Sequence, residues 1–230
     1  MTPSASSDQD RQGDSVLVVE HHGAVRVLTL NRPDKRNALN TTLLRALERE
    51  LCRADQQASV RAIVMAGRGT SFSAGGDRVE FLHSTNARLA MAERARLMGE
   101  ILTLIPELSV PVVSAVRGAA LGGGAALALA ADMTIAGDDL RLGYPELGDG
   151  VIPAVVMPGA VHLFGRRLAF ELLSTQRTLS AEEASRYGAV NLVVPADSVV
   201  TAAVMLAEKW AAAEPTAMKT DAIPLAGSIQ

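Results

Sequence analysis

The segments SAGGD (residues 73–77) and LGGGA (residues 121–125) are able to bind a negatively charged oxygen through their backbone. Each follows a predicted strand and a short connection and places small residues before a predicted helix, so backbone N–H groups stay uncovered by side chains. Such N–H groups at a helix N-terminus attract negative charge. If the two loops face one another, one N–H from each holds a single oxygen, an oxyanion hole in which each donor contributes about 3 to 4 kcal/mol.

Other uses of glycine-rich loops fit less well. A phosphate-binding P-loop needs a Lys-Ser/Thr pair after its last glycine, and neither loop has one; the dinucleotide fingerprint GxGxxG is also absent from the sequence. Alternatively, the glycines only permit tight turns and close helix packing. Two such loops, each following a predicted strand, favour a functional site.

The composition suits a globular domain and excludes some partners. The 230 residues are 48% hydrophobic and 20% charged, which fits one domain with a sizeable core, alone or with a small appendage. The net charge of -3 and the isoelectric point near 5.8 argue against nucleic-acid binding. Cys52 is the only cysteine, which excludes an internal disulfide and predicts a buried structural thiol.

Several further expectations concern metals and location. The histidines show no metal-binding spacing, so no metal is expected at His21, His22, His83 and His162. No apolar run has the length of a membrane span, and residues 1–15 are polar and lack an apolar signal core. We therefore expect a cytoplasmic protein that binds neither membrane nor nucleic acid and begins with a flexible tail.

The two loops need strands and helices to position them. The pattern predicts a hairpin followed by short buried strands, at residues 16–20, 24–30, 62–66, 110–116, 133–136 and 190–194. Helices are predicted at residues 40–57, 86–105, 124–131, 158–173, 180–187 and 196–213. Asn40 or Thr41 caps the first helix, Pro106 ends the second, and Ser180 with Glu183 forms a capping box. This alternation predicts an α/β fold.

Taken together, the motifs NRPDKRNALN, SFSAGGD, VRGAALGGGAALALAAD and GYPELGDGVIP resemble the crotonase superfamily (enoyl-CoA hydratase/isomerase) over residues 16–220. This resemblance implies a ClpP-like spiral of repeated ββα units, a homotrimer or hexamer, and acyl-CoA substrates converted through an enolate. It implies that the N–H groups of Gly76 and Gly123 hold the enolate oxygen. It also implies a spiral core at residues 16–195 and a short C-terminal helical region at 196–230, where family members usually continue with further helices.

The sequence departs from the family pattern at one catalytic position. Hydratases of this family typically carry two glutamates; the first position is Ala126 here, and the second matches Glu146. By resemblance, Glu146 carries most of the proton transfer. Its apolar neighbours predict partial desolvation and a raised pKa, which suits acid/base exchange. Asp149 and Glu107 are weaker candidates for a second group.

One glutamate is compatible with several reactions on an enolate. As an isomerase, Glu146 would move a proton from C2 to C4 of a 3-enoyl-CoA; as a hydro-lyase, it would manage water and the C2 proton. The stretch GVIPAVVMP (residues 150–158) resembles hydratases and dehydratases of branched substrates and favours the hydro-lyase. A non-catalytic acyl-CoA-binding homologue is the alternative of another class.

The resemblance also implies where coenzyme A binds, as part of the substrate and with no other cofactor. Lys35 and Arg36 would lie along it, although a solvated loop is the alternative, and Arg78 is a further possibility. The remaining candidates would line the acyl tunnel or border the adenine and pantetheine path, at Ala38, Leu39, Ala74 and Asp77.

Overall fold

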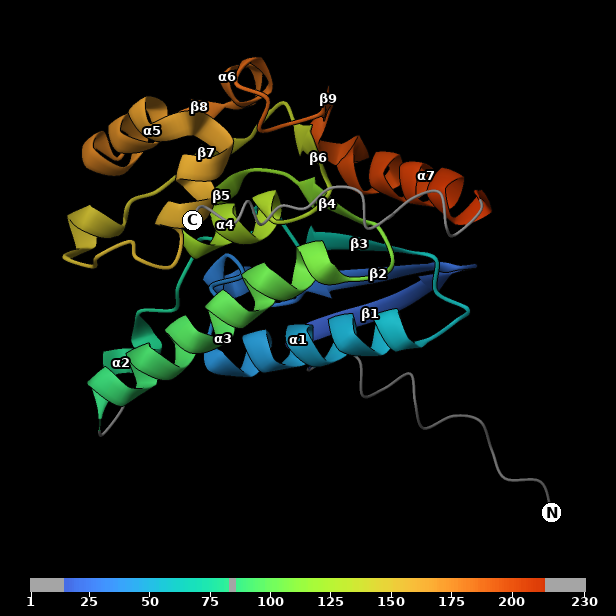
Figure 1. Cartoon of the computed structure of the whole chain (residues 1–230), viewed down its shortest axis with the longest axis horizontal. Coiled ribbons are helices and arrows are strands. Elements are labelled where there is room, and N and C mark those ends of the chain that lie inside the picture. Colours follow the sequence, from blue (N-terminus) through green and yellow to red (C-terminus); the bar gives the residue numbers. More distant parts are fainter. Residues whose placement is uncertain (1–14, 83–85, 214–230) are drawn as a thin grey trace, which may run out of the picture.

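The computed structural model describes residues 15–82 and 86–213 of the chain (Figure 1). It begins with the predicted hairpin, in which β1 (Leu17–His22) pairs antiparallel with β2 (Val25–Leu30). Gly23 lies in the turn with a φ of +59°. The hairpin is confirmed, and its strands carry apolar residues toward the core, such as Leu28 at 0% exposure.

Four further strands extend this hairpin into a sheet with the order β1-β2-β3-β4-β6-β9. They are β3 (Ala62–Gly67), β4 (Val112–Val116), β6 (Met133–Gly137) and β9 (Leu192–Val194), and all of them run parallel to β2. Parallel strands bring their carboxyl ends to one edge of the sheet. The chain therefore leaves β3 and β4 at the same edge, directly into the first glycine-rich loop and, through residues 117–121, into the second.

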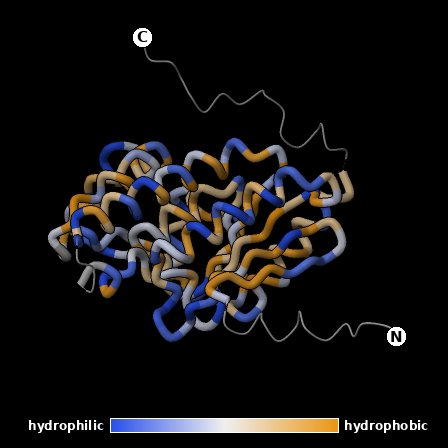
Figure 2. The backbone as a smooth tube through the Cα atoms, turned by 90° about the horizontal axis from the view of Figure 1, so that it is seen from below, coloured by the Kyte–Doolittle hydropathy of each residue, from blue (hydrophilic) through white to orange (hydrophobic). Residues whose placement is uncertain are grey.

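Helices cover both faces of the sheet (Figure 1). On one side α1 (Thr41–Gln56) and α3 (Ala87–Glu107) lie next to each other, and on the other α7 (Val199–Ala212) packs on β3 and β4. Strand residues alternate between the two faces: Met65 belongs to the α1 and α3 side, whereas Val64 packs toward α7. Figure 2 shows the strands as a largely hydrophobic interior.

A second, smaller sheet was not expected from the sequence. It consists of β5 (Ala119–Leu121), β7 (Arg141–Gly143) and β8 (Thr178–Ser180), in the order β5-β7-β8. Together with α4 (Gly123–Leu129) and α5 (Met157–Thr175) it produces two successive ββα units, β4-β5-α4 and β6-β7-α5. The α/β fold and the repeated ββα unit are thus confirmed.

The remaining elements are short. They are α2 (Val79–Leu82), α6 (Ala181–Arg186) and the 3-10 helices η1 (Pro33–Lys35), η2 (Glu146–Asp149) and η3 (Ala196–Ser198). The capping predictions are confirmed: Asn40 caps α1, and Ser180 with Glu183 forms the capping box of α6. Pro106 is the penultimate residue of α3 and not the residue after its end, because the helix continues to Glu107 before it stops. None of the described helices is long and apolar enough to cross a membrane.

Candidate active site

The two glycine-rich loops meet in the structure. The N–H of Ser73 donates to the carbonyl of Ala119 and the N–H of Leu121 donates to the carbonyl of Ser73, both at 3.0 Å. A Cβ added at Gly75 would lie 2.6 Å from the carbonyl oxygen of Leu121 and 3.7 Å from the nitrogen of Gly123. The loop after β3 therefore rests directly on the start of α4, as an oxyanion hole made from both loops requires.

Gly118 occupies the crossing point of these loops, between β4 and β5. Its φ is +56°, and a Cβ there would lie 2.0 Å from the carbonyl oxygen of Thr70. Its N–H donates to the Asp139 carboxylate at 2.9 Å, and its carbonyl accepts from the N–H of Arg141 at 2.8 Å. Only glycine fits this position, which holds the loop after β3 against both short strands.

Two backbone N–H groups at this junction remain available. Within residues 15–82 and 86–213, neither the N–H of Gly76 nor that of Gly123 donates a hydrogen bond. Gly123 is the first residue of α4, and its N-cap residue, Gly122, has no side chain that could accept this hydrogen bond. The side chains of Leu39 and Met98 approach Gly123, at 3.5 and 3.8 Å from the Cβ it lacks. An oxygen bound here would thus accept hydrogen bonds from these N–H groups and lie next to the apolar side chains of Leu39 and Met98.

Glu146 lies beside the second loop. It begins η2, is half-buried, and its Oε1 would be 2.5 Å from a Cβ at Gly122. The N–H of Gly122 donates to the carbonyl of Gly143 at 2.8 Å, so the pairing of β7 with the loop brings the glutamate into place. Burial raises the pKa of Tyr144, and the charge of Glu146 raises it further, so Tyr144 stays neutral. A half-buried carboxylate therefore stands next to the available N–H groups.

The position without a glutamate is part of the core. Ala126 lies in the first turn of α4, and its N–H donates to the carbonyl of Gly122 at 3.0 Å. The side chain is half-buried and packs against the main core. Because α4 contains only glycine, alanine and leucine, it supplies no ionisable group to the site.

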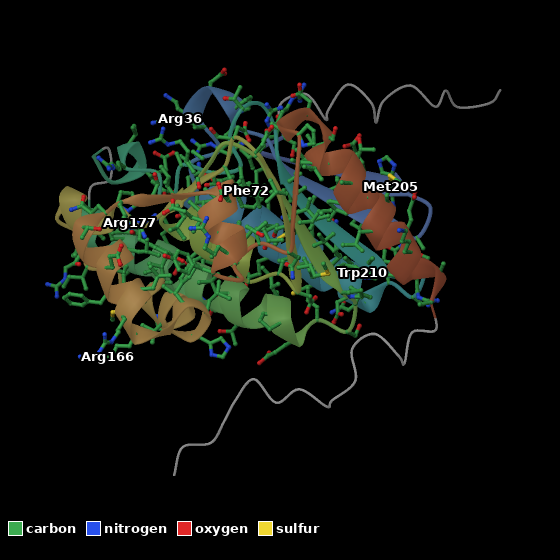
Figure 3. All side chains as sticks on the ribbon, turned by 90° about the horizontal axis from the view of Figure 1, so that it is seen from above. Arg36, Phe72, Arg166, Arg177, Met205 and Trp210 are labelled. Atoms are coloured by element: carbon green, nitrogen blue, oxygen red, sulfur yellow. The ribbon has the colours of Figure 1, made fainter. Side chains whose placement is uncertain are left out.

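The predicted coenzyme A segment runs alongside the first loop. The N–H of Leu39 donates to the carbonyl of Gly75 at 2.8 Å, and the N–H of Ala74 donates to the carbonyl of Arg36 at 2.8 Å. Arg36 and Lys35 are exposed, and Figure 3 shows Arg36 at the margin of the molecule. Ala38 and Ala74 are half-buried, and Leu39 is buried. The structure thus joins the segment 35–39 to the glycine loop, to which Ala74 belongs. The contact of these residues with coenzyme A stays a prediction, as does that of the exposed Arg78.

Asp77 uses its carboxylate within the protein. One oxygen forms an ion pair with Arg32 at 2.8 Å, and the other accepts the N–H of Val79 at 3.0 Å, at the start of α2. Burial alone would raise the pKa of Asp77, but the hydrogen bond and charge of Arg32 lower it below its ordinary value. The geometry gives this side chain a structural role at the base of the loop.

We expect Asp77→Asn to destabilise the protein by about 2 kcal/mol at pH 7, because Arg32 then loses its buried partner while Val79 keeps its cap. Since the folded-state pKa is lowered, the wild type gains this stability above the unfolded pKa and loses it as the pH falls through the folded pKa. Urea denaturation of both proteins from pH 7 to pH 3 tests this. The difference in the free energy of unfolding between the two proteins should become smaller as the pH falls. A difference that does not change with pH would contradict the role of the ion pair.

Two site residues were missed by the sequence analysis. Arg94 and Met98, one turn apart on α3, face Gly76 and Gly123 respectively. Their spacing of four places them on one helix face, but no sequence signal shows that this face meets the glycine loops. The prediction of Glu107 as a weaker candidate for a second acid/base group is wrong. Glu107 is exposed at the far end of α3, about 20 Å along the helix axis from Arg94. The Asp149 side chain lies outside the described residues.

Potential metal ligands do not cluster in the described part of the chain. No group of three or more His, Cys, Asp or Glu side chains there is arranged to hold a metal ion. Cys52 is only half-buried, although its burial, with the charges of Glu48 and Asp55, raises the pKa of its thiol.

The chain is similar to known proteins over most of its length. The family described as enoyl-CoA hydratase/isomerase matches residues 20–222. A 2,3-dehydroadipyl-CoA hydratase of Escherichia coli is 34% identical over 211 residues, which are 89% of this chain and 79% of that protein. A short-chain-enoyl-CoA hydratase of Clostridium acetobutylicum is 32% identical over 206 residues, 88% of this chain and 78% of that protein. The crystal structure of an enoyl-CoA hydratase from Bacillus anthracis superposes with a TM-score of 0.83 at 32% identity, covering 88% of this chain and 79% of that one.

Proposed function

Because the chain belongs to the enoyl-CoA hydratase/isomerase family, we propose that it is an enoyl-CoA hydratase, a hydro-lyase that adds water across the C2=C3 double bond of an acyl-CoA thioester. One observation carries the proposal: the Glu146 carboxylate lies against Gly122, next to the available N–H groups of Gly76 and Gly123. In this proposal Glu146 is the acid/base group, and the negatively charged oxygen binds beside it.

The reaction follows from this arrangement. The thioester oxygen accepts hydrogen bonds from Gly76 and Gly123. The Glu146 carboxylate takes a proton from water, the resulting hydroxide adds to C3, and the electrons of the double bond move onto the thioester oxygen as an enolate. The enolate then collapses as Glu146 returns its proton to C2. The same steps in reverse remove water, and Glu146 ends each cycle as a carboxylate.

Coenzyme A would bind along the exposed loop of Lys35 and Arg36 as part of the substrate. We expect the double variant Lys35→Ala/Arg36→Ala to raise KM for an acyl-CoA about tenfold, because two cations no longer attract the phosphates, while kcat changes little. Steady-state kinetics at two salt concentrations measure this. An unchanged KM at low salt would show that the loop is merely solvated.

The protein would act as a cytoplasmic homotrimer or hexamer in fatty acyl-CoA metabolism. Exposed apolar side chains around η2 and α5 support self-association, since Ile152 is 79% and Phe170 is 71% exposed. Sedimentation at micromolar concentration tests the oligomer.

Mass spectrometry of an acyl-CoA panel in deuterated water tests the function. The panel holds linear 2-enoyl, linear 3-enoyl and branched glutaconyl-type thioesters. A gain of water identifies a hydratase and ranks its substrates. Double-bond migration without water would identify an isomerase instead. Binding without turnover or deuterium exchange across the panel would identify a non-catalytic acyl-CoA-binding protein.

A further inference from the structure

The guanidinium group of Arg94 lies directly on the first glycine of the proposed oxyanion hole. A Cβ added at Gly76 would be 1.7 Å from Nη1 of Arg94 and 2.7 Å from its Cζ. One turn further along α3, Met98 takes the corresponding place at Gly123. The helix thus presents a positive charge to the first loop and an apolar thioether to the second.

Three carboxylates interact electrostatically with this charge. Burial lowers the pKa of Arg94, whereas Glu80, Asp77 and Glu146 act to raise it. Arginine nevertheless stays protonated in proteins. Asp77 is already paired with Arg32, and one oxygen of Glu80 accepts the N–H of Thr41 at 2.9 Å.

The charges of the site are therefore arranged across the two loops. Arg94 stands at Gly76 on the loop after β3, and Glu146 stands at Gly122 on the loop before α4. The available N–H groups of Gly76 and Gly123 belong to the same two loops, which touch each other. A thioester oxygen held by these N–H groups would lie close to the guanidinium.

We propose that Arg94 is an additional electrostatic residue of this site, whose guanidinium stabilises the negative charge that develops on the thioester oxygen at Gly76. This inference rests on the proposed function, because it requires an enolate. During hydration the negative charge moves from the Glu146 carboxylate, at Gly122, to the oxygen between Gly76 and Gly123. A cation in contact with Gly76 attracts the negative charge that develops on this oxygen. It therefore stabilises the transition state more than the bound substrate.

The alternative is a purely structural ion pair. Glu80 belongs to α2, and α2 packs against α3, so the attraction between Glu80 and Arg94 could serve only to hold the two helices together. A structural pair would affect stability but not the ionisation of a bound ligand. The experiment therefore needs a readout of enolate formation that is independent of water addition.

Acetoacetyl-CoA provides this readout, because its enolate absorbs in the ultraviolet and forms without hydration. The ratio of enolate to keto form of the bound ligand is measured for the wild type, Arg94→Gln, Arg94→Lys and the control Arg96→Gln. Arg96 is exposed on the same helix and pairs only with Glu93 and Glu100 among the described residues. We expect Arg94→Gln to lower the ratio about 100-fold, Arg94→Lys to restore part of it, and Arg96→Gln to leave it unchanged.

Glu80→Gln gives an independent test in the opposite direction. It removes a negative charge beside Arg94 and keeps an oxygen for the N–H of Thr41, so the enolate ratio should rise severalfold. This variant decides the matter if Arg94→Gln does not fold. A folded Arg94→Gln protein with the wild-type ratio, or a Glu80→Gln protein whose ratio does not rise, would overturn the role of Arg94 alone. A wild type that binds acetoacetyl-CoA with no enolate at all would overturn the proposed enolate chemistry as well.

Discussion

Glu146→Gln should reduce turnover of the best acyl-CoA in the panel by about 10³- to 10⁴-fold, while the affinity for the acyl-CoA stays within a few-fold of wild type. Glutamine keeps the size and the contact with Gly122 but neither accepts nor returns a proton. Two of its neighbours do not replace it: α4 has no ionisable side chain, and Tyr144 is held neutral by burial. Steady-state kinetics and calorimetric titration with a saturated acyl-CoA separate the two effects.

Glu107→Gln is the matched control for this substitution. Glu107 is exposed at the end of α3, so the same chemical change there should leave the rate at the wild-type value. If Glu146→Gln retained more than a tenth of the wild-type rate, another group would have to move the proton, and the single-carboxylate mechanism would fail. Loss of acyl-CoA binding together with turnover would instead point to a structural defect.

Gly118→Ala should destabilise the protein by about 3 to 4 kcal/mol. A methyl group there meets the carbonyl oxygen of Thr70 at 2.0 Å, so the backbone of one loop must shift, and a φ of +56° adds strain for any L-residue with a side chain. The backbone of Gly118 also forms hydrogen bonds with the Asp139 carboxylate and with the N–H of Arg141. The shift therefore spreads to β5, which begins at the next residue, and to β7, which begins at Arg141. Urea denaturation monitored by circular dichroism gives the free energy of unfolding.

Gly23→Ala separates strain from collision. Gly23 has a similar φ of +59°, but its added Cβ would meet nothing within 4 Å. Gly23→Ala should lower the free energy of unfolding by about 1 kcal/mol, from backbone strain alone. Equal losses at Gly118 and Gly23 would mean that the contact with Thr70 relaxes freely, and the rigidity assigned to the loop crossing would be wrong.

The elements of the main sheet and its covering helices were predictable because each carries a local pattern. The run of mostly apolar residues in β2, the apolar stripe of α1 and the capping box at Ser180 are each formed by residues close together in the sequence. The second sheet lacks such a pattern. Its strands have three residues each, and β7 pairs with β5 and with β8 across long stretches of chain, so only the folded arrangement defines them.

Some residues of the candidate site were likewise predictable from local sequence, and others were not. The glycines and Glu146 stand in short motifs whose order along the chain matches a family, so they could be selected from the sequence. Arg94 and Met98 lie on an amphipathic helix with several charged residues, of which Arg96 is exposed and paired on the surface. Which of these side chains meets the glycines depends on how α3 packs against the loops, and that packing is a tertiary property.

The presence of alanine at position 126 also bears on the stereochemistry of the product. Ala126 lies in the turn that a second carboxylate would occupy, so in the proposed mechanism Glu146 alone activates the water for C3 and delivers the proton to C2. A single side chain reaches both carbons only from the side of the double bond that it faces. Hydroxyl and hydrogen would then be added to the same face, so hydration in deuterated water should give one diastereomer, with the label at C2 syn to the new hydroxyl group.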